Sequence, residues 1–121
     1  DLMPVLNRFA EMLPEISAWR RDIHANPELR FEEHRTAAFV ATKLEEFGRG
    51  EIITGFGGTG FVGVINGETG STGKTIGFRA DMDAHPIQEA TGLPHASTIP
   101  GKMHARGHDT DRTRCAGSTG M

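Results

Sequence analysis

Two carboxylates stand close together just after an apolar run in the second half of the sequence. Asp81 and Asp83 belong to the segment Arg79-Ala80-Asp81-Met82-Asp83. In an extended segment, residues two apart point to the same side, so both carboxylates can face one site. There they can bind a cation or hold the imidazole of a metal ligand in place. An isolated pair of this kind is more often a solvated turn, so its meaning depends on the residues around it.

Histidine concentrates in the same part of the chain. Four histidines follow the aspartates, in a stretch that ends His104-Ala105-Arg106-Gly107-His108-Asp109: His85, His95, His104 and His108. Imidazole and carboxylate ligands together suit borderline divalent ions such as zinc, manganese, cobalt and nickel. Composition alone leaves two alternatives open, a metal site and a polar loop without a metal. His24 and His34 fall in predicted helices, and we interpret them as surface or packing residues.

The elements that must position these side chains begin with helices. Apolar residues recur at three- and four-residue steps over residues 5–23, which is the period of an amphipathic helix. Because proline fits the first turn of a helix and not its interior, Pro14 predicts two helices, one before it and one from Pro14 to Ala25. A further helix is predicted over residues 31–47, and Gly48 would end it.

Strands are predicted after these helices. Three short runs rich in β-branched and aromatic residues, 51–54, 61–65 and 75–79, are separated by glycine clusters. They predict three strands joined by turns. In open α/β sheets, functional groups gather beyond the carboxyl ends of strands, and Asp81 and Asp83 follow the third run directly. The chain beyond them is interrupted by proline and glycine and shows no sustained period.

Two nucleotide-binding patterns fail on inspection. The segment Gly55-Phe56-Gly57-Gly58-Thr59-Gly60 has the G-x-G-x-x-G spacing, but that motif must open a helix, and here a predicted strand follows. Gly73-Lys74-Thr75 resembles the end of a phosphate-binding loop, yet the residue five positions before Gly73 is Glu68 instead of glycine. We therefore interpret both as turns between strands.

Composition excludes several classes of protein. A formal net charge of -3 provides no basic surface for phosphates, so we expect no nucleic-acid partner. No apolar run is long enough to span a bilayer, so we expect no membrane association. Cys115 is the single cysteine, which excludes an intramolecular disulfide and favours a reducing, cytoplasmic location.

Several motifs, taken together, resemble the aminoacylase and hippurate-hydrolase family of metallopeptidases. In order, they are Trp19-Arg20-Arg21-Asp22-Ile23-His24, Pro27-Glu28-Leu29 with Phe31-Glu32-Glu33, Gly57-Gly58-Thr59-Gly60, and the segments 78–89, 91–94 and 100–105. The most similar subgroup is the bacterial amidohydrolases that cut N-acyl amino acids, hippurate among them. The resemblance implies an α/β fold in which residues 1–109 form the N-terminal portion of a mixed-sheet, helix-flanked catalytic domain, incomplete in this chain.

The resemblance also implies an active site. In the family, a pair of divalent metal ions (manganese, zinc, cobalt or nickel) shares a bridging water, which a glutamate deprotonates for attack on the amide carbonyl. The subgroup's loop reads Cys-Gly-His-Asp-Gly-His, in which the cysteine and the first histidine bind metal. Carried over to this sequence, the metal ligand is His108 and the next residue is Asp109. Asp83 matches an aspartate that orients a site group, and Asp81 lies at the neighbouring position.

The sequence departs from the family at one ligand and after the loop. Arg106 occupies the cysteine position, and a guanidinium has no lone pair to donate, so we do not expect it to bind metal. His104, Asp109 and Arg106 would lie beside the site. Residues 110–121 lack any apolar period, so we expect a divergent, irregular tail, and we interpret the loss of similarity near Asp109 as a change of reading frame.

These departures leave two hypotheses for the protein. In the first, the chain is a fragment of an amidohydrolase whose small-molecule substrates are N-acyl amino acids, and dimerisation requires a full-length form. In the second, it is a truncated or degenerate relative without a functional metal pair. On both hypotheses we expect the chain alone to bind metal weakly and to be inactive, because the family's glutamate base and remaining ligands lie beyond residue 109.

Overall fold

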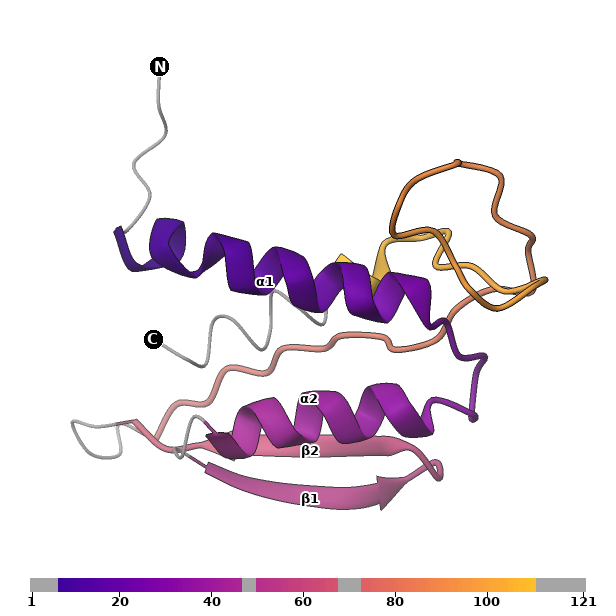
Figure 1. Ribbon diagram of the computed structural model, residues 1–121. Coiled ribbons are helices and arrows are strands. Elements are labelled where there is room, and N and C mark those ends of the chain that lie inside the picture. The colour runs from indigo at the N-terminus through magenta and orange to yellow at the C-terminus, as the bar shows by residue number, and fades with distance from the viewer. Residues whose placement is uncertain (1–6, 47–49, 68–72, 111–121) are drawn as a thin grey trace.

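The computed structural model describes residues 7–46, 50–67 and 73–110 (Figure 1). Two helices precede two strands: α1 (Asn7–Ala25), α2 (His34–Glu46), β1 (Gly50–Phe56) and β2 (Gly60–Ile65). The mixture of helix and strand agrees with the expected α/β class. None of the described helices is long and apolar enough to cross a membrane. Residues 108–110 are helical, so Thr110, the first residue of the tail that we expected to be irregular, is not irregular; residues 111–121 lie outside the described residues.

Helix α1 is continuous through Pro14, so the predicted break there is wrong. A proline inside a helix removes the hydrogen bond to the carbonyl four residues earlier, which here belongs to Ala10. Both Ala10 and Pro14 are exposed, so water can reach the unpaired carbonyl. The other face of α1 buries Trp19 and Ile23, which are 8% and 1% exposed. Burial of this face stabilises the part of the helix that follows the proline.

Helix α2 begins at His34, three residues later than its pattern predicts. Phe31 causes the delay, because its backbone has φ 66, a left-handed conformation that interrupts helical geometry. Glu28 then caps the helix: its carboxylate accepts hydrogen bonds from the N–H groups of Arg35 and Thr36, at 3.0 and 2.6 Å. These N–H groups belong to the first turn, where the helix itself provides no acceptor.

Strands β1 and β2 form an antiparallel hairpin in which Gly50 pairs with Ile65 and Thr54 with Phe61. The connecting turn contains Gly57, whose φ of +59 glycine adopts without steric cost. This turn between two strands confirms that the glycine-rich string is not a dinucleotide-binding loop. One face of the hairpin packs on α2, as Figure 1 shows.

The predicted third strand does not form in the described part of the chain. Residues 75–79 are not assigned to any strand, and Figure 1 shows this segment running as an extended trace past α2. Ile76 and Phe78 are 80% and 86% exposed. A β-rich sequence becomes a strand only when another strand supplies its hydrogen bonds, and here none of the described residues does so.

The irregular segment that begins after residue 80 and ends before the helical residues 108–110 is attached to the end of α1 and to the loop that follows it. Ala84 donates its N–H to the carbonyl of Glu28 at 2.7 Å, and Thr98 donates both its N–H and its hydroxyl to the carbonyl of Ala25 at 2.8 Å. His85 and Met103 exchange backbone hydrogen bonds as an isolated antiparallel bridge. These bonds bring the aspartates and histidines of this segment against α1 without a regular sheet beneath them.

Candidate functional site

Asp81, Asp83 and His108 lie together, as the sequence predicts. The Nδ1 atom of His108 is 3.0 Å from Oδ1 of Asp83 and 3.1 Å from its backbone oxygen. The Nε2 atom of the same ring is 4.0 Å from Oδ2 of Asp81. The side chains of Asp81 and Asp83 are 42% and 26% exposed, and that of His108 is 16% exposed. The site is therefore partly open to solvent.

The contacts of His108 fix which ring nitrogen is available. Both oxygens near Nδ1 belong to Asp83 and can only accept, so Nδ1 carries the proton and donates it. In the neutral ring, Nε2 then keeps its lone pair and faces the carboxylate of Asp81. A carboxylate that holds a histidine tautomer in this way is the usual support for an imidazole that binds metal.

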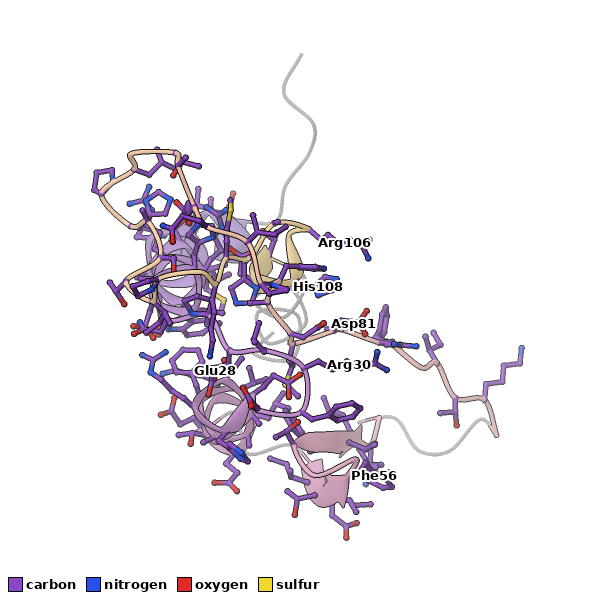
Figure 2. The ribbon with its side chains drawn as sticks, turned by 90° about the vertical axis from the view of Figure 1, so that its right-hand side faces the viewer. Glu28, Arg30, Phe56, Asp81, Arg106 and His108 are labelled. Carbon is purple, nitrogen blue, oxygen red and sulfur yellow. The ribbon has the colours of Figure 1, made fainter. Side chains whose placement is uncertain are left out.

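The described residues do not complete a metal centre. Two ligands that bind one zinc ion tetrahedrally at about 2.0–2.1 Å lie roughly 3.4 Å apart, so Asp81 would need to move by about 0.6 Å toward His108. A catalytic zinc also needs a third protein ligand. Within the described residues, no three histidine, cysteine or carboxylate side chains converge closely enough to hold a metal ion. Figure 2 shows His108 between Asp81 and the exposed Arg106, which offers no lone pair.

His85 is the other histidine near this site. Its ring centroid lies 5.9 Å from that of His108. The Nδ1 atom of His85 is buried and has no hydrogen-bond partner among the residues that the structure describes. His85 therefore borders the site, while its backbone is held by Met103.

Asp109 does not point toward Asp81 and Asp83. It belongs to a second cluster, which is buried against α1. Its side chain is 0% exposed, and Oδ2 lies 2.9 Å from Nδ1 of His24 and 3.0 Å from Nε of Arg20. The other ring nitrogen of His24, Nε2, lies 2.8 Å from Oε1 of Glu89, whose side chain is 2% exposed. We call Arg20, His24, Glu89 and Asp109 the buried network.

The charges of the buried network balance. Ionised carboxylates only accept hydrogen bonds, so His24 satisfies both Glu89 and Asp109 only as an imidazolium that donates from both nitrogens. Burial raises the pKa of Glu89, but hydrogen bonds from Thr91, Ser97 and His24 outweigh it and hold the pKa below its ordinary value. Arg20 and His24 then oppose two carboxylates. Such pairing is needed because an unpaired buried charge costs several kcal/mol.

The remaining histidines also gather around His24. The ring of His95 lies 5.6 Å from that of His24, and the ring of His104 lies 6.4 Å away. Burial and the positive charges of Arg21 and Arg20 lower the pKa of His95. The four loop histidines therefore do not form one metal site. His85 lies beside His108, whereas His95 and His104 lie beside His24. His104, which we expected beside the metal site, packs with the buried network.

Sequence reasoning missed the role of His24. It is 4% exposed and bonded to two carboxylates, so the description of His24 as a surface or packing residue is incomplete. One signal was available: Arg20 and His24 are four residues apart and flank Ile23, so both lie on the buried face of α1. Polar residues on a buried face require partners elsewhere in the fold. His34, by contrast, is exposed, as expected.

Comparisons with known proteins support the resemblance seen in the motifs. Residues 77–119 match the model of peptidase family M20/M25/M40. This match includes the aspartates and His108, and it extends past Asp109 over most of the tail that we expected to diverge. The change of reading frame stays a prediction.

Individual relatives match over most of this chain and a smaller part of their own. Hippurate hydrolase of Campylobacter jejuni is 46% identical over 111 residues, which is 92% of this chain and 28% of that protein. The N-acyl-L-amino acid amidohydrolase of Geobacillus stearothermophilus is 42% identical over 82% of this chain and 26% of its own length. A dinuclear metal-binding M20 peptidase from Bacillus subtilis superimposes with a TM-score of 0.80 at 39% identity, covering 88% of this chain and 29% of that one.

The chain thus spans less than a third of the length of these relatives. Within that span, sequence identity near 40% and a TM-score of 0.80 agree on one ancestry, and the motifs shared with the family include the segment that pairs Asp83 with His108. The chain belongs to peptidase family M20/M25/M40.

Proposed function

We propose that this chain contributes part of the active site of a metal-dependent amidohydrolase that cleaves N-acyl amino acids such as hippurate. The observation that carries the proposal is the pair formed by His108 and Asp83, which leaves Nε2 of His108 facing Asp81. The names of two relatives, a hippurate hydrolase and an N-acyl-L-amino acid amidohydrolase, support this class of substrate. The dinuclear metal-binding neighbour supports a pair of divalent ions, for which manganese, zinc, cobalt and nickel are the candidates.

In this proposal each described residue has a separate task. Asp83 orients His108, His108 offers Nε2 to a metal ion, and Asp81 offers a second carboxylate near the same place. The described residues include no third ligand at this point, so the proposed activity depends on residues outside them. Dimerisation of a longer form and a cytoplasmic location are parts of the same proposal.

Arg106 favours a second candidate, a relative without catalytic function. A permanent positive charge beside His108 repels a divalent ion, and the guanidinium cannot replace the thiolate that the resemblance places there. On this alternative the fold and the pair formed by His108 and Asp83 persist without a metal pair. The nucleotide sequence downstream of Asp109 distinguishes the two, because a change of reading frame would restore the family's remaining motifs.

The sharpest test transfers residues 1–109 into a complete relative. In hippurate hydrolase of Campylobacter jejuni, the matching segment is replaced by residues 1–109 of this chain, once with Arg106 retained and once with the substitution Arg106→Cys. We expect hippurate hydrolysis with manganese or zinc from the substituted chimera. The chimera that retains Arg106 should lose activity by at least about 100-fold, since a missing metal ligand removes the activated water.

Both results bear on the choice between the two candidates. A folded chimera that carries Arg106→Cys and has no activity would overturn the proposed function. Equal activity of both chimeras would remove the argument for the non-catalytic alternative.

A further inference from the structure

Asp109 connects the helical turn that carries His108, residues 108–110, to helix α1. Its Oδ1 accepts the N–H of Thr110 at 3.0 Å, within the turn itself. Its Oδ2 accepts from His24 at 2.9 Å and pairs with Arg20 at 3.0 Å, both on α1. The carboxylate thus has one oxygen bonded inside the turn and the other bonded to the helix.

The turn is fixed at several points at once. Besides the bond to Asp109, the N–H of Thr110 donates to the carbonyl of Gly107 at 2.9 Å. His108 immediately precedes Asp109, and its ring contacts Asp83 on the opposite side of the turn. A rotation of the turn would move both side chains together, so the anchor of one limits the freedom of the other. Binding sites tolerate errors of only about 0.5 Å and 10–20° in such groups.

We infer that His24 and Arg20, acting through Asp109, are positioning residues for His108. Their contact with Asp109 holds the turn in the orientation in which Nδ1 of His108 meets Asp83 and Nε2 faces Asp81. The effect on metal binding rests on the proposed function. The effect on the ring of His108 does not, because Asp83 orients that ring in the metal-free chain.

A purely structural role for the buried network is the competing explanation, and Glu89 separates the two. The Glu89 side chain is 2% exposed, against 0% for that of Asp109, and it bonds to the same His24 at 2.8 Å. Its other partners are Thr91 and Ser97, which lie in the loop before the turn that carries His108. Glu89→Gln is therefore a matched control: it removes one buried charge of the same network while leaving the contacts of Asp109 in place.

The first experiment reads the ring of His108 directly. Histidine side chains of the full 121-residue chain are labelled with nitrogen-15, and the ring nitrogen signals are recorded at about pH 8.5, where an unperturbed imidazole is neutral. The wild-type chain is expected to show one dominant tautomer for His108, with the proton on Nδ1. In Asp109→Asn and His24→Gln, we expect His108 to shift toward the mixed tautomers of a free imidazole. In Glu89→Gln, we expect the tautomer populations of His108 to match those of the wild-type chain.

The tautomer populations of His108 in these variants either support or reject the positioning role. Unchanged tautomers in a folded Asp109→Asn chain would overturn the inference, and so would an equal change in Glu89→Gln. If Asp109→Asn does not fold, Arg20→Gln takes its place, because the Arg20 side chain is 38% exposed and Oδ2 of Asp109 keeps its contact with His24 when Arg20 is lost. A shift in Arg20→Gln supports the inference, and its absence rejects it.

A second measurement links positioning to metal binding. In an Arg106→Cys background, Asp109→Asn should lower zinc affinity in calorimetry by about 10–100-fold, the usual effect of losing a residue that supports a ligand. Glu89→Gln in the same background should leave the affinity almost unchanged. If the Arg106→Cys chain binds no zinc at all, the proposed function fails while the tautomer result still stands on its own. Equal losses in both variants would reject the positioning role.

Discussion

Replacing Glu28 with glutamine tests how the turn between α1 and α2 is held. Oε1 of Glu28 accepts from the N–H and the hydroxyl of Thr36, both at 2.6 Å, and Oε2 accepts from the N–H of Arg35 at 3.0 Å. Hydrogen bonds to charged groups contribute about 1.5–3 kcal/mol and neutral ones about 0.5–1.5 kcal/mol. Glutamine weakens the two partly buried bonds and loses the exposed one. We therefore expect the free energy of unfolding at pH 7 to fall by about 2–3 kcal/mol.

The size of this loss depends on pH. Burial raises the pKa of Glu28, but hydrogen bonds from Thr36 and from Arg35 outweigh it and hold the pKa below its ordinary value of 4.5. Because the pKa in the folded state is lowered, the stabilisation by the carboxylate is fully present above pH 4.5. It is lost as the pH falls through the folded-state value. The wild-type chain and Glu28→Gln should therefore converge in stability in acid well below pH 4.5.

Urea unfolding followed by tryptophan fluorescence measures both effects. Trp19 is the single tryptophan and is 8% exposed, so its emission reports loss of the core. Glu32→Gln is the matched control in the same turn, because the side chain of Glu32 is 65% exposed and reaches Lys102 only at 4.0 Å. Its effect should be below about 0.5 kcal/mol. A Glu28→Gln chain as stable as this control at pH 7, or a difference that persists in acid, would refute the reasoning.

Other changes test the site, the exposed segment and the first helix. Arg106→Cys should raise the zinc affinity of the full chain at least about tenfold in calorimetry, because a thiolate replaces a cation, yet leave hippurate release at the level of the metal-only blank. Turnover above that blank would contradict the proposed dependence on further ligands. Phe78→Asp should reduce self-association in analytical ultracentrifugation, because Phe78 and Ile76 are 86% and 80% exposed in a segment that invites strand pairing. Unchanged sedimentation would count against this. Pro14→Ala should raise the free energy of unfolding by about 1–3 kcal/mol in thermal circular dichroism, since Pro14 lies inside α1. A lower melting temperature would mean that the proline suits its position.

The sequence predicted best the elements that depend on near neighbours. The glycine-rich turn and the strands on either side of it follow from local preferences, and both are present. Two of the errors arise where distant contacts decide. Pro14 does not break α1, because the carbonyl of Ala10 that loses its partner is exposed to water, and the buried residues Trp19 and Ile23 hold the helix after the proline. Residues 75–79 do not form a strand, because β-rich residues cannot supply their own partner.

In the candidate site, too, one part was predictable from the sequence and another part depends on contacts between distant residues. The pairing of Asp83 with His108 was predictable from the resemblance, which placed both residues at one site, and it was found at 3.0 Å. The buried network was not predictable in this way, since His24 and Asp109 are separated by 85 positions and no motif links them. The concentration of histidine in one loop therefore left a shared metal site open as an alternative, although His95 and His104 pack around His24.

What decides the role of each histidine is the nearest carboxylate. Asp83 leaves one nitrogen of His108 free, whereas Glu89 and Asp109 occupy both nitrogens of His24. A ring binds metal through a nitrogen that keeps its lone pair, and an imidazolium that donates from both nitrogens has none. Of these two histidines, therefore, only His108 can serve as a metal ligand in this arrangement, and His24 is excluded from that task.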